Sequence, residues 1–382
     1  MAEQFKGHEH LRWSASWSTR EDADEYKFRR RLAEKLGAKG WLFPLYPKKY
    51  GGADLTVDHQ VVLDTELFKY GLNLSHVFYT LARIVAPLLI RWGTDEQKAE
   101  FLPPITKAEI CVWQVLTERH GGSDIANCQT KAIRDGDHYV VNGQKVMVGH
   151  HLPPDYLWTL VCTNPQGKRH ENLAWLHIPA NLPGVTIQHM NLMMGIKNAV
   201  FFDNVRVPAK YLIGGENNGW KVASTHMELE HGGDGRIAVD PLIERVVEYC
   251  HSTHIDGKPI IEDPRVRDLI AEMTIELNTL RRFNQLIYWR RFAKKPHPYG
   301  GPQQRYYQRM LRLRNGERLQ AIMGADALEQ NLSVHEVIDF EYAVRPGPGQ
   351  LHGGGTLDTD RLIFARRLGL GRPTTEKAPE TD

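Results

Sequence analysis

Residues 138–148 read HYVVNGQKVMV, a run rich in β-branched and aromatic side chains that is typical of an extended strand. Four further runs of this kind follow: YLWTLVCTN (156–164), NLAWLHIP (172–179), VTIQHM (185–190) and VFFDNVRVP (200–208). Asn-Gly, Asp-Gly and Pro-Gly turn signals accompany these runs, and no connection between them is long enough for a crossover helix. We therefore expect five strands in an antiparallel barrel or sandwich.

Helical segments flank this β region on both sides. The stretches DHQVVLDTELFKYGL (58–72) and SHVFYTLARIVAPLLIRW (75–92) carry apolar residues at spacings of three and four, and the same period returns after Glu216. These patterns predict an α+β chain. Its three domains are expected at 1–110 (helical), 111–215 (β) and 216–382 (helical).

The overall charge argues against partners with a high negative charge. The chain has 382 residues, with 48 Lys and Arg against 46 Asp and Glu, so the formal net charge is only +2. A charge this small predicts no general attraction to nucleic acid or to an anionic membrane.

The N-terminal residues MAEQFKGHEH lack the apolar core of a signal peptide, and the best apolar run, 84–90, is flanked by arginines. Four widely spaced cysteines without a C-x-x-C pair indicate free thiols, so we expect a cytoplasmic protein without stable membrane insertion.

A polar loop precedes the predicted strands. Residues 113–124, WQVLTERHGGSD, bring Gln114, the hydroxyls of Thr117 and Ser123 and two glycines to the entry of the β region. Such a loop offers hydroxyls and backbone N–H groups to a flat ligand with polar edges. The alternative is an ordinary connection between a helix and a strand.

The helix expected after Glu216 carries an acidic residue among apolar ones. Four residues share one stripe at helical spacing: Trp220, Ala223, Met227 and Glu230. The Glu230 carboxylate is therefore expected to point inward. Burial in a cavity raises the pKa of a carboxyl group, which makes it a usable base near neutral pH. A structural ion pair would give the same pattern, so both interpretations stay open at this point.

Near the C-terminus, three glycines at 353–355 precede Thr356, a residue type that caps helix N-termini well. Helix N-termini behind glycines bind anions and carbonyl oxygens, although a plain cap would have the same sequence. No Gly-Lys-Ser/Thr follows, which argues against a P-loop. The 18 histidines have no carboxylate or cysteine partners at a metal-binding spacing, so no metal site is expected.

Six collinear motifs resemble those of the acyl-CoA dehydrogenase family along almost the whole chain. Residues 93–97 (GTDEQ), with Leu102-Pro, and 117–124 (TERHGGSD) are similar to the family's G-T-x-x-Q and [ST]-E-P-x-A-G-S-D signatures. The others are 142–145 (NGQK), 202–208 (FDNVRVP), 218–220 (NGW) and 354–356 (GGT), the last followed by 365–370 (ARRLGL). The resemblance implies helical, β-barrel and C-terminal four-helix-bundle domains. It also implies FAD as cofactor and assembly as a homodimer, a homotetramer or a heterotetramer.

The reaction implied by this resemblance is the dehydrogenation of an acyl-CoA thioester to a trans-2-enoyl-CoA. In the family, a base removes the pro-R α-proton, the β-hydride moves to flavin N5, and electron-transferring flavoprotein reoxidises the flavin. The base position common in the family is Gly354 here. In the isovaleryl-CoA dehydrogenase branch the base lies in a helix segment to which residues 227–231 (MELEH) align, so the resemblance assigns proton removal to Glu230. The backbone N–H of Gly354 is the implied donor to the thioester oxygen.

The resemblance also assigns binding residues. The implied FAD contacts are Gln114, Thr117, Ser123, Met147, Val148, His251, Thr356 and Asp358. The implied substrate contacts are Ser123, Met227 and Arg236. Four positions depart from the family pattern: Arg119 for Pro, Met147 for a Trp that packs on the flavin, Gly149 for Thr or Ser, and His251 for an Arg that reaches a neighbour's FAD.

Three functions are compatible with these residues. The first is an active FAD-dependent acyl-CoA dehydrogenase, which the presence of Glu230 favours. The second is a partner subunit of a heteromeric dehydrogenase with a degenerate flavin site, which Met147, Gly149 and His251 suggest. The third is a flavin oxidase or monooxygenase on the same fold. A base on the inner helix occurs with bulky substrates in some relatives, so branched, cyclic or steroid-derived acyl groups are preferred, while fatty acyl chains stay open.

Overall fold

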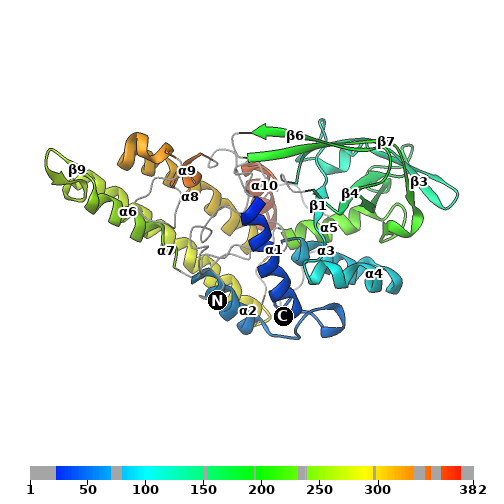
Figure 1. Cartoon of the computed structure of the whole chain (residues 1–382), viewed down its shortest axis with the longest axis horizontal. Coiled ribbons are helices and arrows are strands. Elements are labelled where there is room, and N and C mark those ends of the chain that lie inside the picture. Colours follow the sequence, from blue (N-terminus) through cyan, green and yellow to red (C-terminus); the bar gives the residue numbers. More distant parts are fainter. Residues whose placement is uncertain are drawn as a thin grey trace. The chain divides into compact units, whose positions relative to one another are not determined.

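The computed structural model describes residues 23–69, 80–149, 153–192, 195–230, 237, 239–295, 298–329, 340–345 and 354–370. The chain divides into two compact units, 1–230 and 231–382. Each unit contains its own clusters of buried apolar side chains. Figure 1 labels the helices and several of the strands of both units.

Four helices open the first unit: α1 (Ala23–Ala38), α2 (Val57–Lys69), α3 (Thr80–Trp92) and α4 (Asp95–Thr106). Helix α4 begins with a capping box, in which Gln97 N donates to Thr94 Oγ1 at 3.3 Å and Thr94 N donates to Gln97 Oε1 at 2.9 Å. The Gln97 amide nitrogen also donates to the carbonyl oxygens of Lys210 and Leu212, at 2.7 and 2.8 Å. The GTDEQ motif therefore ties this helix to the end of the β region.

One eight-stranded sheet follows. Its strands are β1 (Val112–Val115), β2 (Lys131–Asp135), β3 (His138–Val148), β4 (Tyr156–Cys162), β5 (Leu173–Pro179), β6 (Val185–Leu192), β7 (Gly195–Pro208) and β8 (Leu212–Ile213). The hydrogen-bonded order is β6-β7-β3-β2-β4-β5-β8, with β1 paired to β4. The five predicted strands, β3 to β7, are confirmed. Most pairs are antiparallel as expected, but β4 runs parallel to both β1 and β2, which the sequence does not reveal.

Strand β4 is buried on both faces. Trp158 and Leu160 enter a core shared with α3, α4 and α5 (Gly219–Glu230), whereas Leu157 and Val161 enter a second core shared with β3 and β7. Because both faces meet apolar partners, β4 reads as a continuous hydrophobic run rather than an alternating one.

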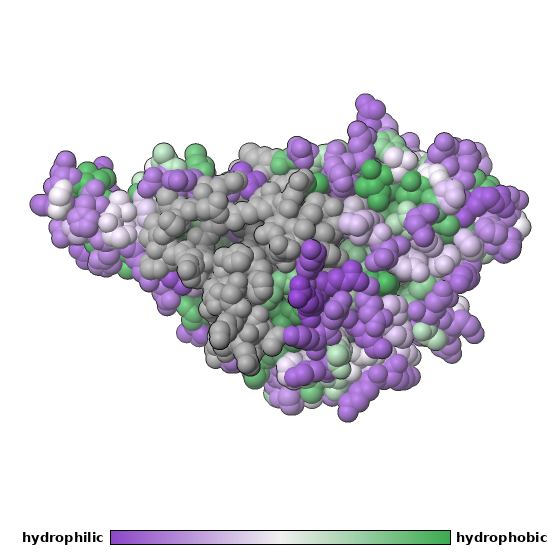
Figure 2. Space-filling model, viewed as in Figure 1, coloured by the Kyte–Doolittle hydropathy of each residue, from purple (hydrophilic) through white to green (hydrophobic). Residues whose placement is uncertain are grey.

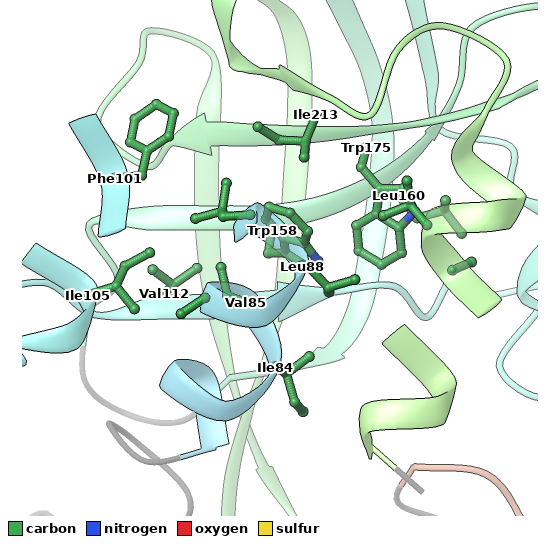
Figure 3. Close-up of a cluster of buried hydrophobic side chains, with 14 of the residues drawn as sticks. Ile84, Val85, Leu88, Phe101, Ile105, Val112, Trp158, Leu160, Trp175 and Ile213 are labelled. Atoms are coloured by element: carbon green, nitrogen blue, oxygen red, sulfur yellow. The ribbon is translucent and has the colours of Figure 1, made fainter. Parts of the chain in front are cut away.

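The first of these cores lies between the sheet and the helices α3, α4 and α5, which lie along one side of it (Figure 1). Figure 3 shows Val85 and Leu88 of α3 in this core beside Trp158 of β4, with Phe101 of α4 at its margin. Trp175 of β5 completes the layer, and its indole N–H donates to the carbonyl oxygen of Gly219 at 2.9 Å. Helix α5 is thereby fixed to the sheet at its first residue.

The second unit is helical. It contains α6 (Leu242–Ser252), α7 (Pro264–Phe292), α8 (Gly300–Met323), α9 (Phe340–Val344), α10 (Leu357–Arg367) and a small hairpin of β9 (His254–Ile255) and β10 (Lys258–Pro259). Val246 of α6, Met273 of α7 and Leu319 of α8 are fully buried in one cluster. The expected order of helices, sheet and helices is therefore confirmed, and the domain boundaries at 110 and 215 stay predictions.

No helix in the described ranges is long and apolar enough to cross a bilayer. On the face drawn in Figure 2, hydrophilic residues cover much of the described surface and apolar residues form scattered patches.

His177 of β5 is a polar residue enclosed by the first core. Its ring stacks on Tyr156 with centroids 4.4 Å apart and meets Phe101 edge-on at 4.8 Å. Among the described residues neither ring nitrogen has a hydrogen-bond partner. Burial lowers the pKa of His177 to about 3, so the ring is neutral in the folded protein.

We expect His177→Phe to stabilise the protein increasingly as the pH falls. A histidine whose folded pKa lies below its unfolded value of about 6.5 contributes stability above pH 6.5 that is lost as the pH falls towards its folded pKa. At about pH 5 this loss is roughly 2 kcal/mol, and phenylalanine does not incur it. Urea unfolding near pH 7.5 and near pH 5 should show the advantage of the variant growing by about this amount. An advantage that does not change with pH would contradict the expectation.

Candidate active site

A buried ion pair fixes the loop at 116–130 to the sheet. Glu118 Oε1 lies 2.8 Å from Lys145 Nζ of β3, with side chains only 6% and 0% exposed. Backbone N–H groups of Thr130 and Gln129 donate to the same carboxylate at 2.9 and 2.7 Å. Burial alone would raise the pKa of Glu118, but the Lys145 charge and these hydrogen bonds outweigh it and lower the pKa to about 2. The loop is therefore held by a carboxylate that stays ionised in the folded protein.

The same contacts place Thr117 beside the end of β3. Lys145 Nζ donates to the carbonyl oxygen of Leu116 at 3.1 Å, and Val146 N donates to that of Thr117 at 2.9 Å. Thr117 is half-buried and Ser123 is exposed. Neither hydroxyl has a hydrogen-bond partner within the described part of the chain. Both hydroxyls are available to a ligand.

The end of β3 presents Met147 to the surface. Met147 is 56% exposed with φ +59°, whereas Val148 is 2% exposed. The Val148 side chain enters the core, so only its backbone can touch a ligand, and its carbonyl oxygen accepts a hydrogen bond from Asn198 Nδ2 at 2.9 Å. The next carbonyl oxygen, of Gly149, accepts one from Lys197 Nζ at 2.9 Å. Burial lowers the pKa of Lys197 to about 7.

Gly149 cannot carry a side chain in this fold. Its φ is +56°, and a Cβ atom at this position would lie 2.2 Å from Cδ2 of Trp113. Trp113 is itself 2% exposed and packed in the second core. The Thr or Ser hydroxyl that the resemblance leads one to expect here is therefore excluded by the indole ring.

Helix α5 buries a wider face than the predicted stripe. Its buried residues are Gly219, Val222, Ala223, Thr225 and His226. Of the predicted stripe, Ala223 is buried in the first core, Trp220 is half-buried and packs against it, and Met227 and Glu230 are half-buried. Polar residues occupy part of the true buried face, which an apolar pattern cannot reveal. Glu230 follows Val222 and His226 at intervals of four, and its side chain is 21% exposed.

Glu230 meets His226, and His226 meets Gln114 of β1. Glu230 Oε2 lies 3.5 Å from His226 Nε2. The same ring nitrogen lies 3.0 Å from Gln114 Nε2, a contact between residues 112 positions apart. Two candidate residues with different expected roles are thus brought together by a histidine for which no role is predicted. Its position four residues before the candidate base is the signal that could have identified it.

In the second unit, the candidate residues at 354–358 form the N-terminal end of α10. Thr359 N donates to Thr356 Oγ1 at 3.2 Å, which confirms the predicted cap. Gly354 and Gly355 have φ values of +67° and +101°. Their carbonyl oxygens accept hydrogen bonds from α8, that of Gly354 from Arg305 and that of Gly355 from Arg309 at 2.6 Å.

Asp360 holds both arginines in place. It is 1% exposed and lies 2.9 Å from Arg309 Nη1 and 3.5 Å from Arg305 Nε. In a trans peptide the C=O and the following N–H point in opposite directions. Holding these two carbonyl groups against α8 therefore turns the N–H groups of Gly355 and Thr356 away from it. The sequence gives no sign of this arginine-aspartate cluster.

Three further predicted residues stand apart from these groups. The Asp358 side chain is 91% exposed and lies 3.7 Å from Arg361. His251 is exposed in the last turn of α6, and Arg236 lies outside the described residues. Across the described ranges, no group of three or more His, Cys, Asp or Glu side chains is placed to hold a metal ion.

The residues of the first unit fit a flavin, with one donor fewer than the resemblance implies. Thr117 and Ser123 offer hydroxyls, and Met147 offers an exposed, polarisable side chain beside Thr117 that can pack on a ring. The side-chain hydroxyl at position 149 is the missing donor.

Comparisons with known proteins cover nearly the whole chain. The N-terminal, middle and C-terminal domain models of acyl-CoA dehydrogenase match residues 8–109, 114–205 and 217–369. The acyl-CoA dehydrogenase FadE26 of Mycobacterium tuberculosis is 31% identical over 67% of this chain, and the match spans 64% of that protein's length.

Two solved structures have a similar fold. The ChsE4-ChsE5 complex from Mycobacterium tuberculosis matches with a TM-score of 0.82 and 27% identity over 98% of this chain and 99% of that chain. The steroid ACAD Tcur3481-Tcur3483 matches with a TM-score of 0.80 and 26% identity over 97% of this chain and 93% of that chain.

Proposed function

Because the chain belongs to the acyl-CoA dehydrogenase family, we propose that it removes hydrogen from Cα and Cβ of an acyl-CoA thioester and forms a trans-2-enoyl-CoA. One observation carries this proposal: the Glu230 carboxylate at the end of α5 is only 21% exposed and lies 3.5 Å from Nε2 of the buried His226. A chain that only supported a partner would have no use for a carboxylate in this position.

Glu230 acts as the base in this proposal. The Cα–H bond breaks, the proton passes to a Glu230 oxygen, and the electron pair stays on the substrate. Negative charge then develops on the thioester oxygen, and the backbone N–H of Gly354 donates a hydrogen bond to it. The arginine-aspartate cluster holds the carbonyl groups of Gly354 and Gly355 and so restrains the loop that carries this N–H group.

The flavin is held mainly by the loop at 114–123 and the end of β3. FAD, when bound, accepts the β-hydride and is reoxidised by electron-transferring flavoprotein. Thr117 and Ser123 donate from their hydroxyls, Met147 packs on the ring, and Val148 contributes its backbone. The remaining proposed contacts are Gln114, Thr356, Asp358 and, from a second copy or a partner subunit, His251.

The substrate class that these residues favour is a bulky acyl group. Ser123, Met227 and Arg236 are the proposed acyl-CoA contacts. The similarity to a steroid ACAD supports a steroid-derived group over a straight fatty acyl chain. We also propose a cytoplasmic location, supported by four cysteines that are all buried and unpaired.

A second candidate function is supported by Gly149. A hydroxyl donor to the flavin cannot be accommodated there while Trp113 keeps its place. In a heteromeric dehydrogenase, this chain would be the subunit that binds FAD weakly and depends on its partner subunit for a complete flavin site. An active homodimer or homotetramer would instead have to retain FAD without the hydroxyl donor at position 149.

One experiment separates these candidates. The chain is purified alone, its flavin spectrum is recorded, and it is mixed without oxygen with straight, branched and steroid-derived acyl-CoA thioesters. The proposed function expects a yellow protein that at least one thioester bleaches. A colourless protein would support the partner-subunit function, and rapid reoxidation by air with peroxide or an oxygenated product would support an oxidase or monooxygenase.

A further inference from the structure

His226 is held rigidly beside the proposed base. It is 0% exposed, and its ring stacks on Trp175 with centroids 5.1 Å apart and planes 22° apart. Trp175 is in turn fixed by its hydrogen bond to the carbonyl oxygen of Gly219, the first residue of the same helix. The direction of each ring nitrogen of His226 is therefore set by packing.

Among the described residues, only one nitrogen of this ring has neighbours that can share a proton. Nε2 lies 3.0 Å from the Gln114 amide and 3.5 Å from Glu230 Oε2. Nδ1 is buried, and among the described residues it has no hydrogen-bond partner. A buried N–H group without an acceptor is costly, so a proton on Nδ1 is disfavoured.

The charge of Glu230 points to the same tautomer. A carboxylate only accepts hydrogen bonds, and an unprotonated Nε2 would turn its lone pair towards Glu230. A proton on Nε2 instead gives the carboxylate a donor. Gln114 suits this tautomer after a half-turn of its amide, which brings Oε1 to the ring in place of Nε2. The Nε2–H group then faces two acceptors, one on Gln114 and one on Glu230.

We propose that His226 is a positioning residue for Glu230, whose Nε2–H is shared between the Glu230 carboxylate and the Gln114 amide oxygen. The inference rests on the proposed function and extends it. While Glu230 is ionised, the charge-assisted hydrogen bond holds one carboxylate oxygen in place and so orients the carboxylate. Once Glu230 has taken the α-proton it becomes a weaker acceptor, and the Nε2–H group turns to Gln114. The donor thus keeps a partner in both states of the base.

The test uses two substitutions that distinguish the effect of the N–H donor from the effect of ring stacking. His226→Phe keeps a ring to stack on Trp175 but removes the donor, whereas His226→Gln keeps an N–H group at a similar distance along the side chain. Thr225→Val is the matched control, because Thr225 is buried on the same helix and accepts a hydrogen bond from Trp92 Nε1 at 3.2 Å, apart from this site. The readout is exchange of the substrate α-proton with D2O, followed by mass spectrometry without an electron acceptor.

We expect exchange to slow about tenfold in His226→Phe, the rate equivalent of one hydrogen bond, with kcat affected more than KM. His226→Gln should recover most of that loss, and Thr225→Val should match the wild type. Equal exchange in the wild type and His226→Phe would overturn the inference, as would a His226→Gln variant as slow as His226→Phe. A wild-type protein that exchanges no acyl-CoA tested would overturn the proposed function and, with it, this inference.

A second readout does not depend on turnover. Nitrogen-15 labelling of the histidines should give one signal of an Nε2-protonated ring that disappears in His226→Phe and shifts in Glu230→Gln. An Nδ1-protonated ring at this position would overturn the inference even if the variants were slow.

Discussion

Glu230→Gln should bind FAD as the wild type does and lose bleaching by acyl-CoA by roughly three orders of magnitude, within the range for removal of a general base. Glutamine has nearly the same shape, and its amide oxygen can still accept the hydrogen bond from His226, so α5 should keep its packing. It cannot take up the α-proton at neutral pH. Stopped-flow absorbance of the flavin under anaerobic conditions measures the loss.

The matched control for this variant is Glu228→Gln. Glu228 lies on the same helix, and its side chain is exposed. It should bleach at the wild-type rate. If Glu230→Gln bleached at an undiminished rate, the base would have to be sought elsewhere in the chain. Loss of FAD from Glu230→Gln would instead indicate a structural role for the carboxylate.

Glu118→Gln should lower the free energy of unfolding by about 3 kcal/mol, because it leaves the Lys145 ammonium buried without its counter-ion. Lys145 is fully buried, so water cannot replace the lost carboxylate. The loop carrying Thr117 should loosen as well, and FAD should dissociate more readily. Urea unfolding at neutral pH and the flavin content after dialysis measure the two effects.

The pH dependence provides a second check on Glu118. Its pKa is lowered to about 2 in the folded protein, so its contribution is complete above the unfolded value near 4.5 and is lost as the pH falls towards 2. By pH 4 the gap between wild type and Glu118→Gln should narrow by about 1 kcal/mol. Glu171→Gln, at an exposed position of the same unit, is the control and should change little. A gap that did not narrow would mean that Glu118 is not the stabilising carboxylate.

Periodicity in the sequence was enough to predict the larger elements. The strands β3 to β7 are long runs of β-branched and aromatic residues, and the structure has strands at the predicted positions. The strands β1, β2 and β8 have four, five and two residues, too few for any period to be recognised. The parallel pairing of β1 with β4 depends on contacts that no local pattern encodes.

The same distinction applies to the residues of the candidate site. The hydroxyls of Thr117 and Ser123 and the carboxylate of Glu230 stand in motifs, so they could be named from the sequence. The roles of Lys145, His226 and Asp360 depend on partners distant in the chain, and each is a polar residue buried because of that partner. The predicted stripe on α5 is incomplete for the same reason, since it does not include the buried polar residues His226 and Thr225.

The contact between Trp113 and Gly149 also restricts the order in which this site can change over evolutionary time. A serine or threonine at 149 would place its Cβ 2.2 Å from the indole, on a backbone with φ +56°. Such a substitution alone would clash with the indole ring. It can be accommodated only in a lineage in which Trp113 has already been replaced by a smaller residue. The route back to a hydroxyl at this position therefore runs through an intermediate with a smaller core residue, which makes the present glycine difficult to reverse.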